Sequence, residues 1–218
     1  MYTHEYLHDF VKRFFIAMGC NEADATLISD VFIAAELRGI PSHGMIRVKD
    51  YYQLWKAGRI NIKPNIRIVH ETPSTAVVDG DGAIGMLAAS KSMEIAIDKA
   101  SKAGTGWVST RGSNHYGIAG YYAMMALKHD MIGISMTNSQ PLVAPTYGRT
   151  AVIGTNPISF AAPSYNEYPF VLDMATSVVP IGRIKVYEEK KEKIPLGWGI
   201  DDNGNVTDDP AKIKSGGP

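Results

Sequence analysis

The sequence has one cysteine among its 218 residues and no excess of either charge, and each shortage excludes a class of protein. A single thiol, Cys20, cannot build a disulfide framework or a cysteine-based zinc site. Lys plus Arg and Asp plus Glu each total 22, so the chain has no excess of positive charge that would attract nucleic acid or an anionic membrane. No apolar run approaches the roughly 20 residues of a membrane helix, and residues 1–10 lack a signal-peptide core. We therefore expect a cytoplasmic protein with a small-molecule substrate and neither a nucleic-acid nor a membrane partner.

The first 65 residues have the periodicity of helices and form the predicted helical N-terminal part. Apolar side chains share one face from Glu5 to Met18, and Gly19 is a typical helix end. Asn21 can cap a second helix that ends near Gly39. This part of the chain therefore predicts amphipathic helices packed on a shared core.

A third helix is expected to run from Met45 to Gly58, after a loop at Pro41–Gly44. His43, Arg47 and Tyr51 are four residues apart, so the pattern predicts that they line up along one helical face. For such a triplet taken alone, a polar edge on a core helix is the more common explanation.

Residues 66–218 change to strands that alternate with helices, the pattern of an α/β layer. The expected strands are 66–69, 75–79, 106–110, 131–138, 158–162 and 170–174, and the expected helices are 86–103 and 118–128. We predict that residues 66–218 form the cofactor-binding and catalytic part. Residues 211–218 provide no capped element, which is consistent with a chain that stops within its fold.

The segment Gly112–Ala123 places His115 where a strand is expected to turn into a helix. A titratable ring at such a turn can face a cleft, and histidine titrates near neutrality. A lone histidine in an α/β protein is nevertheless more often structural.

Two metal-like motifs in the sequence have simpler explanations. His4-Glu5-Tyr6-Leu7-His8 matches a zinc-binding helix pattern, but it lies at a chain end and lacks a third ligand, so we predict no metal site there. Asp201-x-Asn203-x-Asn205 resembles the start of a calcium loop. Its glycine and its bidentate glutamate are replaced, so we predict a turn instead.

The glycine motif Gly80–Gly85 matches the dinucleotide fingerprint G-x-G-x-x-G between a strand and a helix. The next strand should end in an acidic residue, but it ends in Ser109, Thr110 and Arg111. A tight glycine turn that packs a helix on a strand is the favoured explanation, and a Rossmann-type phosphate site stays open as an alternative.

The polar residues at the ends of elements suit the oxidation of a 2-hydroxy acid. That reaction needs a base for the hydroxyl proton, a cation for the carboxylate and a nicotinamide that accepts hydride. Histidine can serve as base and arginine as a two-pronged carboxylate donor. The candidates are His43, Arg47, Tyr51, His115, Asn138-Ser139, Thr155-Asn156 and Asp173.

Four motifs in order resemble the signatures of the malate/L-lactate dehydrogenase family, which includes sulfolactate and ureidoglycolate dehydrogenases. They are Pro41-Ser42-His43-Gly44 with Arg47, Gly112–Gly120, Gly154-Thr155-Asn156-Pro157, and Leu172–Ser177. The resemblance implies a non-Rossmann, sulfolactate dehydrogenase-like α/β fold with three layers around a mixed sheet. It also implies a homodimer that uses NAD or NADP.

The same resemblance implies roles for individual residues. His115 falls on the family's active-site histidine, and His43 is the second candidate for the proton acceptor. Arg47 and Tyr51 match positions that grip the substrate. The positions that contact the nicotinamide are matched by Ser139, Asp173, Met174 and Ala175.

This chain differs from members of the family in its length. Those members run further and supply a cofactor-contacting lysine from the later part, so we expect this chain to be incomplete at its C-terminus. The predicted function is hydride transfer between NAD(P) and a small 2-hydroxy or 2-oxo acid. Reduction of a cyclic imino acid and a non-catalytic, truncated remnant are the alternatives.

Overall fold

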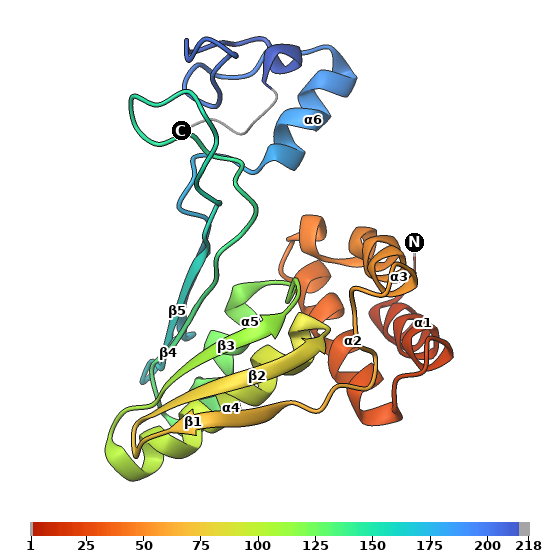
Figure 1. Cartoon of the computed structure of the whole chain (residues 1–218), viewed down its shortest axis with the longest axis vertical. Coiled ribbons are helices and arrows are strands. Elements are labelled where there is room, and N and C mark those ends of the chain that lie inside the picture. Colours follow the sequence, from red (N-terminus) through yellow and green to blue (C-terminus); the bar gives the residue numbers. More distant parts are fainter. Residues whose placement is uncertain (1, 214–218) are drawn as a thin grey trace. The chain divides into compact units, whose positions relative to one another are not determined.

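The computed structural model describes residues 2–213, which gather into two compact units. Within the described residues, unit 1 comprises residues 2–133 and 161–171, and unit 2 comprises residues 134–160 and 172–213. In chain order the helices and strands before residue 130 are α1 (His4–Ala17), α2 (Glu22–Leu37), η1 (Pro41–His43), η2 (Met45–Arg47), α3 (Val48–Lys56), β1 (Arg67–Glu71), β2 (Thr75–Ala83), α4 (Gly85–Ala103), β3 (Trp107–Ser113), α5 (Ala119–Met125) and η3 (Ala126–His129). The others are β4 (Gly133–Met136), β5 (Ile158–Ala162), β6 (Phe170–Met174), α6 (Ile181–Lys190) and η4 (Pro210–Lys212). These elements alternate in the way expected of an α/β protein (Figure 1).

The N-terminal helices begin and end close to the predicted residues. The Thr3 side chain caps α1, and the Asn21 side chain accepts the Asp24 N–H at the start of α2. Their buried faces meet around Phe15, Ile28 and Phe32, each fully buried. A fully buried side chain of this size contributes about 1.5–3 kcal/mol through the hydrophobic effect, so these contacts are the main support of the helical part.

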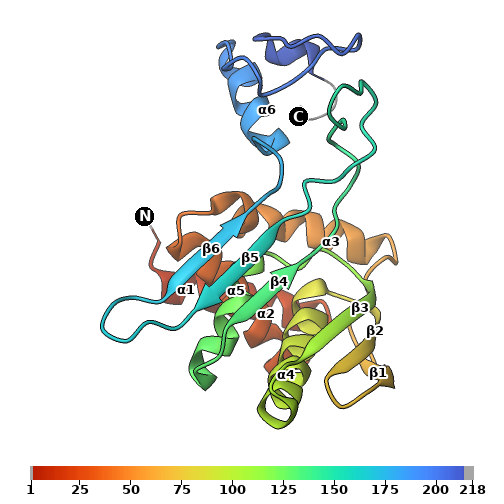
Figure 2. The same cartoon turned by 90° about the vertical axis from the view of Figure 1, so that its left-hand side faces the viewer.

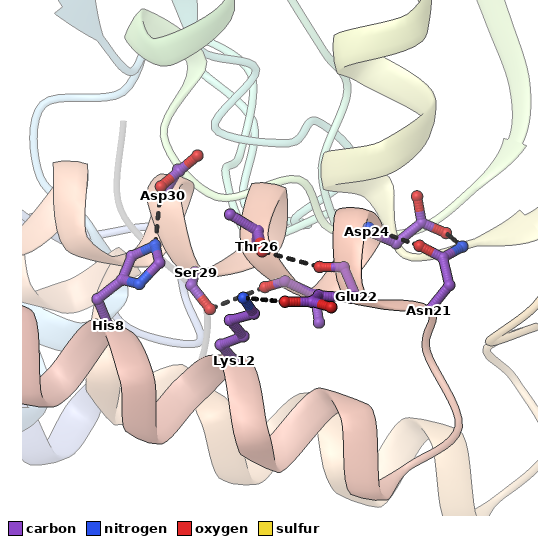
Figure 3. Close-up of polar contacts among 9 residues, drawn as sticks. His8, Lys12, Asn21, Glu22, Asp24, Thr26, Ser29 and Asp30 are labelled. Carbon is purple, nitrogen blue, oxygen red and sulfur yellow. Dashed lines mark hydrogen bonds and ion pairs between the residues drawn. The ribbon is translucent and has the colours of Figure 1, made fainter.

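Polar contacts also join the exposed edges of α1 and α2 (Figure 3). His8 Nε2 lies 2.8 Å from Asp30 Oδ1, and Lys12 Nζ donates to Glu22 Oε1 at 2.7 Å. Exposed pairs of this kind contribute little to stability, typically about 0–1 kcal/mol. They do show that His8 faces α2, where it pairs with a carboxylate.

The third predicted helix was wrong in its first turn. Residues 41–43 and 45–47 form two separate 3-10 turns, and α3 begins only at Val48. The interruption is at Gly44, whose ψ of −142° is not helical. His43, Arg47 and Tyr51 therefore do not share one helical face, although they still lie near one another for a different reason described below.

The strands pair as two three-stranded sheets, ordered β1-β2-β3 and β4-β5-β6. The first is mixed, because β1 runs antiparallel to β2 while β3 runs parallel to it. The parallel pair is connected through α4, which packs against β2 and β3 (Figure 1). The three strands of the second sheet are seen face-on in Figure 2. The predicted mixed α/β fold is confirmed, and each predicted strand is present.

The region after β6 holds α6, η4 and a small core. Ile184, Ile194 and Ile213 pack together there, and the Arg183 guanidinium lies over the Trp198 ring. Asp209 caps η4, so the prediction of no capped element was wrong for residues 211–213, while residues 214–218 lie outside the described part. Within residues 2–213, no helix combines the length and apolarity needed to cross a membrane.

The predicted turn at Asp201 is confirmed. The Asp201 carboxylate accepts the backbone N–H groups of Asn203 and Asn205, each at 2.9 Å, within a turn closed by Gly204. Hydrogen bonds from these N–H groups lower the pKa of this carboxyl. The carboxylate thus organises its own loop, as Asx turns do.

Candidate active site around His115

His115 lies in the loop between β3 and α5, as the sequence predicted, and the end of β2 holds that loop in place. The Asn114 side-chain amide donates to the carbonyl oxygens of Gly82 and Ala83 at 3.0 and 2.9 Å. The hydroxyl of buried Tyr122 donates to the Tyr116 carbonyl oxygen. Both neighbours of His115 are therefore anchored through backbone carbonyl groups.

Glycines of the Gly80–Gly85 motif make room for the same loop. An ideal Cβ on Gly85 would lie 2.1 Å from the Asn114 oxygen, and one on Gly80 would lie 2.9 Å from the Gly112 oxygen. Asp81 and Gly82 take positive φ angles where the pairing of β2 with β3 is shifted. The motif thus makes a close packing contact, which supports the favoured explanation over a phosphate-binding turn.

Tyr51 contacts His115 directly and is buried, with 2% of its surface exposed. Its hydroxyl oxygen lies 2.6 Å from His115 Nδ1 and 3.0 Å from the His115 carbonyl oxygen. A tyrosine has one hydroxyl hydrogen, so both contacts are satisfied when Nδ1–H donates to Tyr51 and Tyr51 donates to the carbonyl. The Gly117 N–H also points at Nδ1, but at 3.4 Å this contact is too long to decide the tautomer. The network therefore assigns the free lone pair to His115 Nε2.

The ring of His43 stacks on that of His115. Their centroids are 5.4 Å apart and the planes differ by 22°. His43 is half-buried, and its Nδ1 contacts the Ser42 hydroxyl at 3.0 Å. Two imidazoles that overlap in this way cannot both be protonated without repulsion, so the pair favours at most one positive charge.

The surroundings lower the pKa of both histidines. Removal from water is the larger cause, and the positive charge of Arg47 adds to it. The pKa of His115 falls to about 4, with a protonated His43 as a further cause and Asp50 acting in the opposite direction. His115 is still exposed as a residue, so the covered part is the Nδ1 side that faces Tyr51. At neutral pH His115 is therefore a neutral base that solvent can reach.

Burial also raises the pKa of Tyr51 well above its ordinary value, with smaller opposing effects from the Arg47 charge and the Gly117 N–H. The hydroxyl thus stays protonated across the physiological range. It can act as a fixed hydrogen-bond partner for His115, and its burial leaves little surface for contact with a substrate. The substrate-gripping role expected of Tyr51 stays a prediction.

Arg47 supplies the positive charge beside the two rings. Its Nε donates to the Ser42 carbonyl oxygen at 2.8 Å, and its Nη1 lies 3.0 Å from Asp50 Oδ2. The side chain is about half exposed, so its guanidinium remains open to a ligand. A guanidinium held at its Nε still presents donors that match a carboxylate. Asp50, which the sequence reasoning missed, is the group that such a ligand would compete with.

The other predicted residues belong to unit 2. The Ser139 hydroxyl accepts the Thr155 N–H at 2.8 Å, and the Ser139 N–H donates to Asn156 Oδ1 at 3.1 Å. Thr176 donates to the Thr155 carbonyl oxygen through both its N–H and its hydroxyl. The segments after β4, before β5 and after β6 are thereby tied into one polar cluster. Next to it on the chain are Asp173, exposed Met174 and Ala175.

Within residues 2–213, no group of three His, Cys, Asp or Glu side chains is arranged to hold a metal ion. His4 lies 3.0 Å from Glu5, and His8 pairs with Asp30. The two histidines of the zinc-like sequence therefore contact surface carboxylates.

Comparison with known proteins relates this geometry to a family. The profile of malate/L-lactate dehydrogenase matches residues 2–218. A malate dehydrogenase of Pyrococcus abyssi is 52% identical over 97% of this chain and 58% of its own length. The sulfolactate dehydrogenase structure from Methanocaldococcus jannaschii superposes with a TM-score of 0.93 at 45% identity, covering 98% of this chain and 62% of that one.

A more distant structure extends the comparison. The Δ1-piperideine-2-carboxylate reductase of Pseudomonas syringae superposes with a TM-score of 0.92 at 27% identity, covering 99% of this chain and 66% of that one. The chain spans 58–59% of the length of three curated relatives, two malate dehydrogenases and a sulfolactate dehydrogenase. By sequence and by fold, it belongs to the malate/L-lactate dehydrogenase family.

Proposed function

We propose that this protein transfers hydride between NAD or NADP and C2 of a small 2-hydroxy or 2-oxo acid. The single observation that carries the proposal is the cluster of Tyr51, His115 and His43 with Arg47 beside it. It combines a neutral base that is held by its Nδ1 side with a partly exposed cation. A hydroxy acid offers the matching groups, a hydroxyl proton and a carboxylate.

The proposed roles follow from the position of each group. Arg47 binds the substrate carboxylate, and His115 Nε2 accepts the hydroxyl proton while Tyr51 holds Nδ1–H and so keeps the ring oriented. Once protonated, His115 is destabilised by Arg47, which favours passing the proton on to water. When bound, the oxidised nicotinamide supplies the acceptor for the C2 hydride.

The fit of a nicotinamide rests on the polar cluster of unit 2. The hydrogen bonds of Ser139 with Thr155 and Asn156 create a fixed set of polar groups, and Met174 is an exposed apolar side chain. Such a combination suits an aromatic ring that bears a carboxamide. We therefore propose that Ser139, Asp173, Met174 and Ala175 contact the nicotinamide.

Two alternatives to hydroxy acid dehydrogenation can be tested by experiment. Reduction of a cyclic imino acid would use the same carboxylate next to the reducible carbon, and the Pseudomonas syringae relative is named for such a reaction. A non-catalytic form would keep the fold without turnover. Adding NADH to the 218-residue protein and following cofactor fluorescence shows whether this chain binds the cofactor. A panel of 2-hydroxy, 2-oxo and cyclic imino acids with both cofactors then tests the reaction itself.

Arg47→Ala is expected to weaken substrate binding more than it slows chemistry. Loss of a charge-assisted contact to a carboxylate typically costs about 1.5–3 kcal/mol, so KM should rise by roughly 10- to 100-fold with kcat changed less. Steady-state kinetics with the preferred acid measure both values. An unaltered KM would remove Arg47 from the substrate site, and Arg13→Ala on the surface of α1 serves as a control that should change neither value.

We further propose a homodimer in the cytoplasm, as the family resemblance implies. Sedimentation velocity at micromolar concentration tests the dimer, since a monomer at every concentration would contradict it.

A further inference from the structure

Glu36, in the last turn of α2, makes two close contacts with the turn that carries His43 and Arg47. Its Oε1 accepts the Met45 N–H at 2.7 Å. An ideal Cβ on Gly44 would lie 2.1 Å from the same Oε1 and 2.6 Å from Cδ, so the carboxylate rests directly on the glycine backbone. Only a residue without a side chain at position 44 leaves room for this arrangement.

The contact sits where the backbone needs an acceptor. Met45 is the first residue of η2, and the N–H groups at the start of a helical segment have no partner within it. Gly44 precedes η2 and has no side chain to act as a cap, and Arg47 does not cap α3. Glu36 therefore supplies from another helix the negatively charged acceptor that an N-cap would normally provide.

We propose that Glu36 is a positioning residue that fixes the Gly44 turn and thereby holds His43 and Arg47 beside His115. The link to catalysis rests on the proposed function, whereas the structural link does not. Both side chains depend on the turn, because His43 belongs to η1 on one side of Gly44 and Arg47 to η2 on the other. Arg47 Nε also donates to the Ser42 carbonyl oxygen, and this hydrogen bond joins the two halves of the turn.

The Gly44 turn sets where His43 and Arg47 lie relative to His115. The His43 ring overlaps His115 at 5.4 Å between centroids, and the Arg47 charge reaches both rings. Misplacing a site group by about 1 Å can cost on the order of 100-fold in rate. A turn released from Glu36 would shift His43 and Arg47 relative to His115, which is held separately by Tyr51 and the end of β2.

The test compares Glu36→Ala with Glu36→Gln, whose amide oxygen can still accept the Met45 N–H. In the 218-residue protein we expect Glu36→Ala to lose hydrogen-exchange protection at Met45 and to shift the NMR signals of the His43 ring. Glu36→Gln should stay near the wild type in both respects. The exposed rings of His70 and His129 are internal controls whose signals should not move in either variant.

In the active enzyme, kcat/KM should fall by about 10- to 100-fold in Glu36→Ala, mainly through KM, and by less than about 3-fold in Glu36→Gln. If Glu36→Ala does not fold, Gly44→Ala offers the same test, because its methyl group would displace the intact carboxylate. Unmoved His43 signals together with an exposed Met45 amide would overturn the proposal. The hydrogen-exchange and NMR measurements need no cofactor. An inactive wild type would therefore contradict the proposed function and would not touch the positioning role of Glu36.

Discussion

Replacing His115 with alanine is expected to lower turnover by about 10²- to 10⁴-fold, the usual contribution of general acid–base catalysis. The reason is that Nε2, which the Tyr51 contact leaves free, is the proposed base, and its low pKa keeps it unprotonated at neutral pH. Steady-state kinetics measure the loss in kcat. Because the folded-state pKa is lowered, oxidation should stay constant from neutral pH downward and decline only as the pH approaches about 4.

Two companion variants make the assignment specific. Tyr51→Phe removes the hydroxyl that orients His115 but keeps the buried ring, so we expect a smaller loss than in His115→Ala. His43→Ala tests the second candidate for the proton acceptor. If turnover persists in His115→Ala and disappears in His43→Ala, the base is His43 and the tautomer argument fails.

Gly85→Ala is expected to destabilise the fold, although helices in general prefer alanine to glycine. Gly85 is the first residue of α4, where propensity alone would make alanine better by up to about 1 kcal/mol. The added methyl group, however, would lie 2.1 Å from the Asn114 oxygen and 2.5 Å from the His115 oxygen, and backbone atoms cannot move aside cheaply. Overpacking of this kind costs about 1–3 kcal/mol, or roughly 2–4 °C in Tm for each kcal/mol.

The sign of the change in Tm decides between the gain in helix propensity and the steric clash. Thermal unfolding followed by circular dichroism should show a lower Tm for Gly85→Ala, and a higher Tm would mean that the loop does not rest on α4. Gly104→Ala at the other end of α4 serves as a comparison without a clash. Its methyl group would meet open space, so its whole cost should be the strain of a left-handed backbone, about 1–2 kcal/mol.

The parts of the fold governed by local rules could be predicted from the sequence. Asn21 caps α2 as its spacing with Asp24 indicated, and strands β5 and β6 have the predicted bounds, because turn-forming residues border each of them. His115 also lies at the predicted strand-to-helix turn. In each case the signal and the structure that it specifies lie within a few residues of one another.

What the sequence could not provide depends on contacts between distant residues. The helix expected from Met45 begins as a 3-10 turn after the non-helical Gly44, and its first N–H is accepted by Glu36, nine residues earlier, a contact that no spacing indicates. The partnership of Tyr51 with His115 spans 64 residues, and no periodicity reports it. His43 and Tyr51 both contact His115, but not along the single helical face that their four-residue spacing with Arg47 predicted.

In the proposed reaction, His115 and Arg47 serve hydride transfer from C2 of a 2-hydroxy acid. The most direct measurement uses malate and lactate deuterated at C2 with NAD or NADP, and detects deuterium in the nicotinamide by mass spectrometry. We expect the label to appear in the reduced cofactor, and we expect His115→Ala to reduce the rate of its appearance by about 10²-fold or more. Label transfer that is equally fast without His115 would rule out His115 as the proton acceptor.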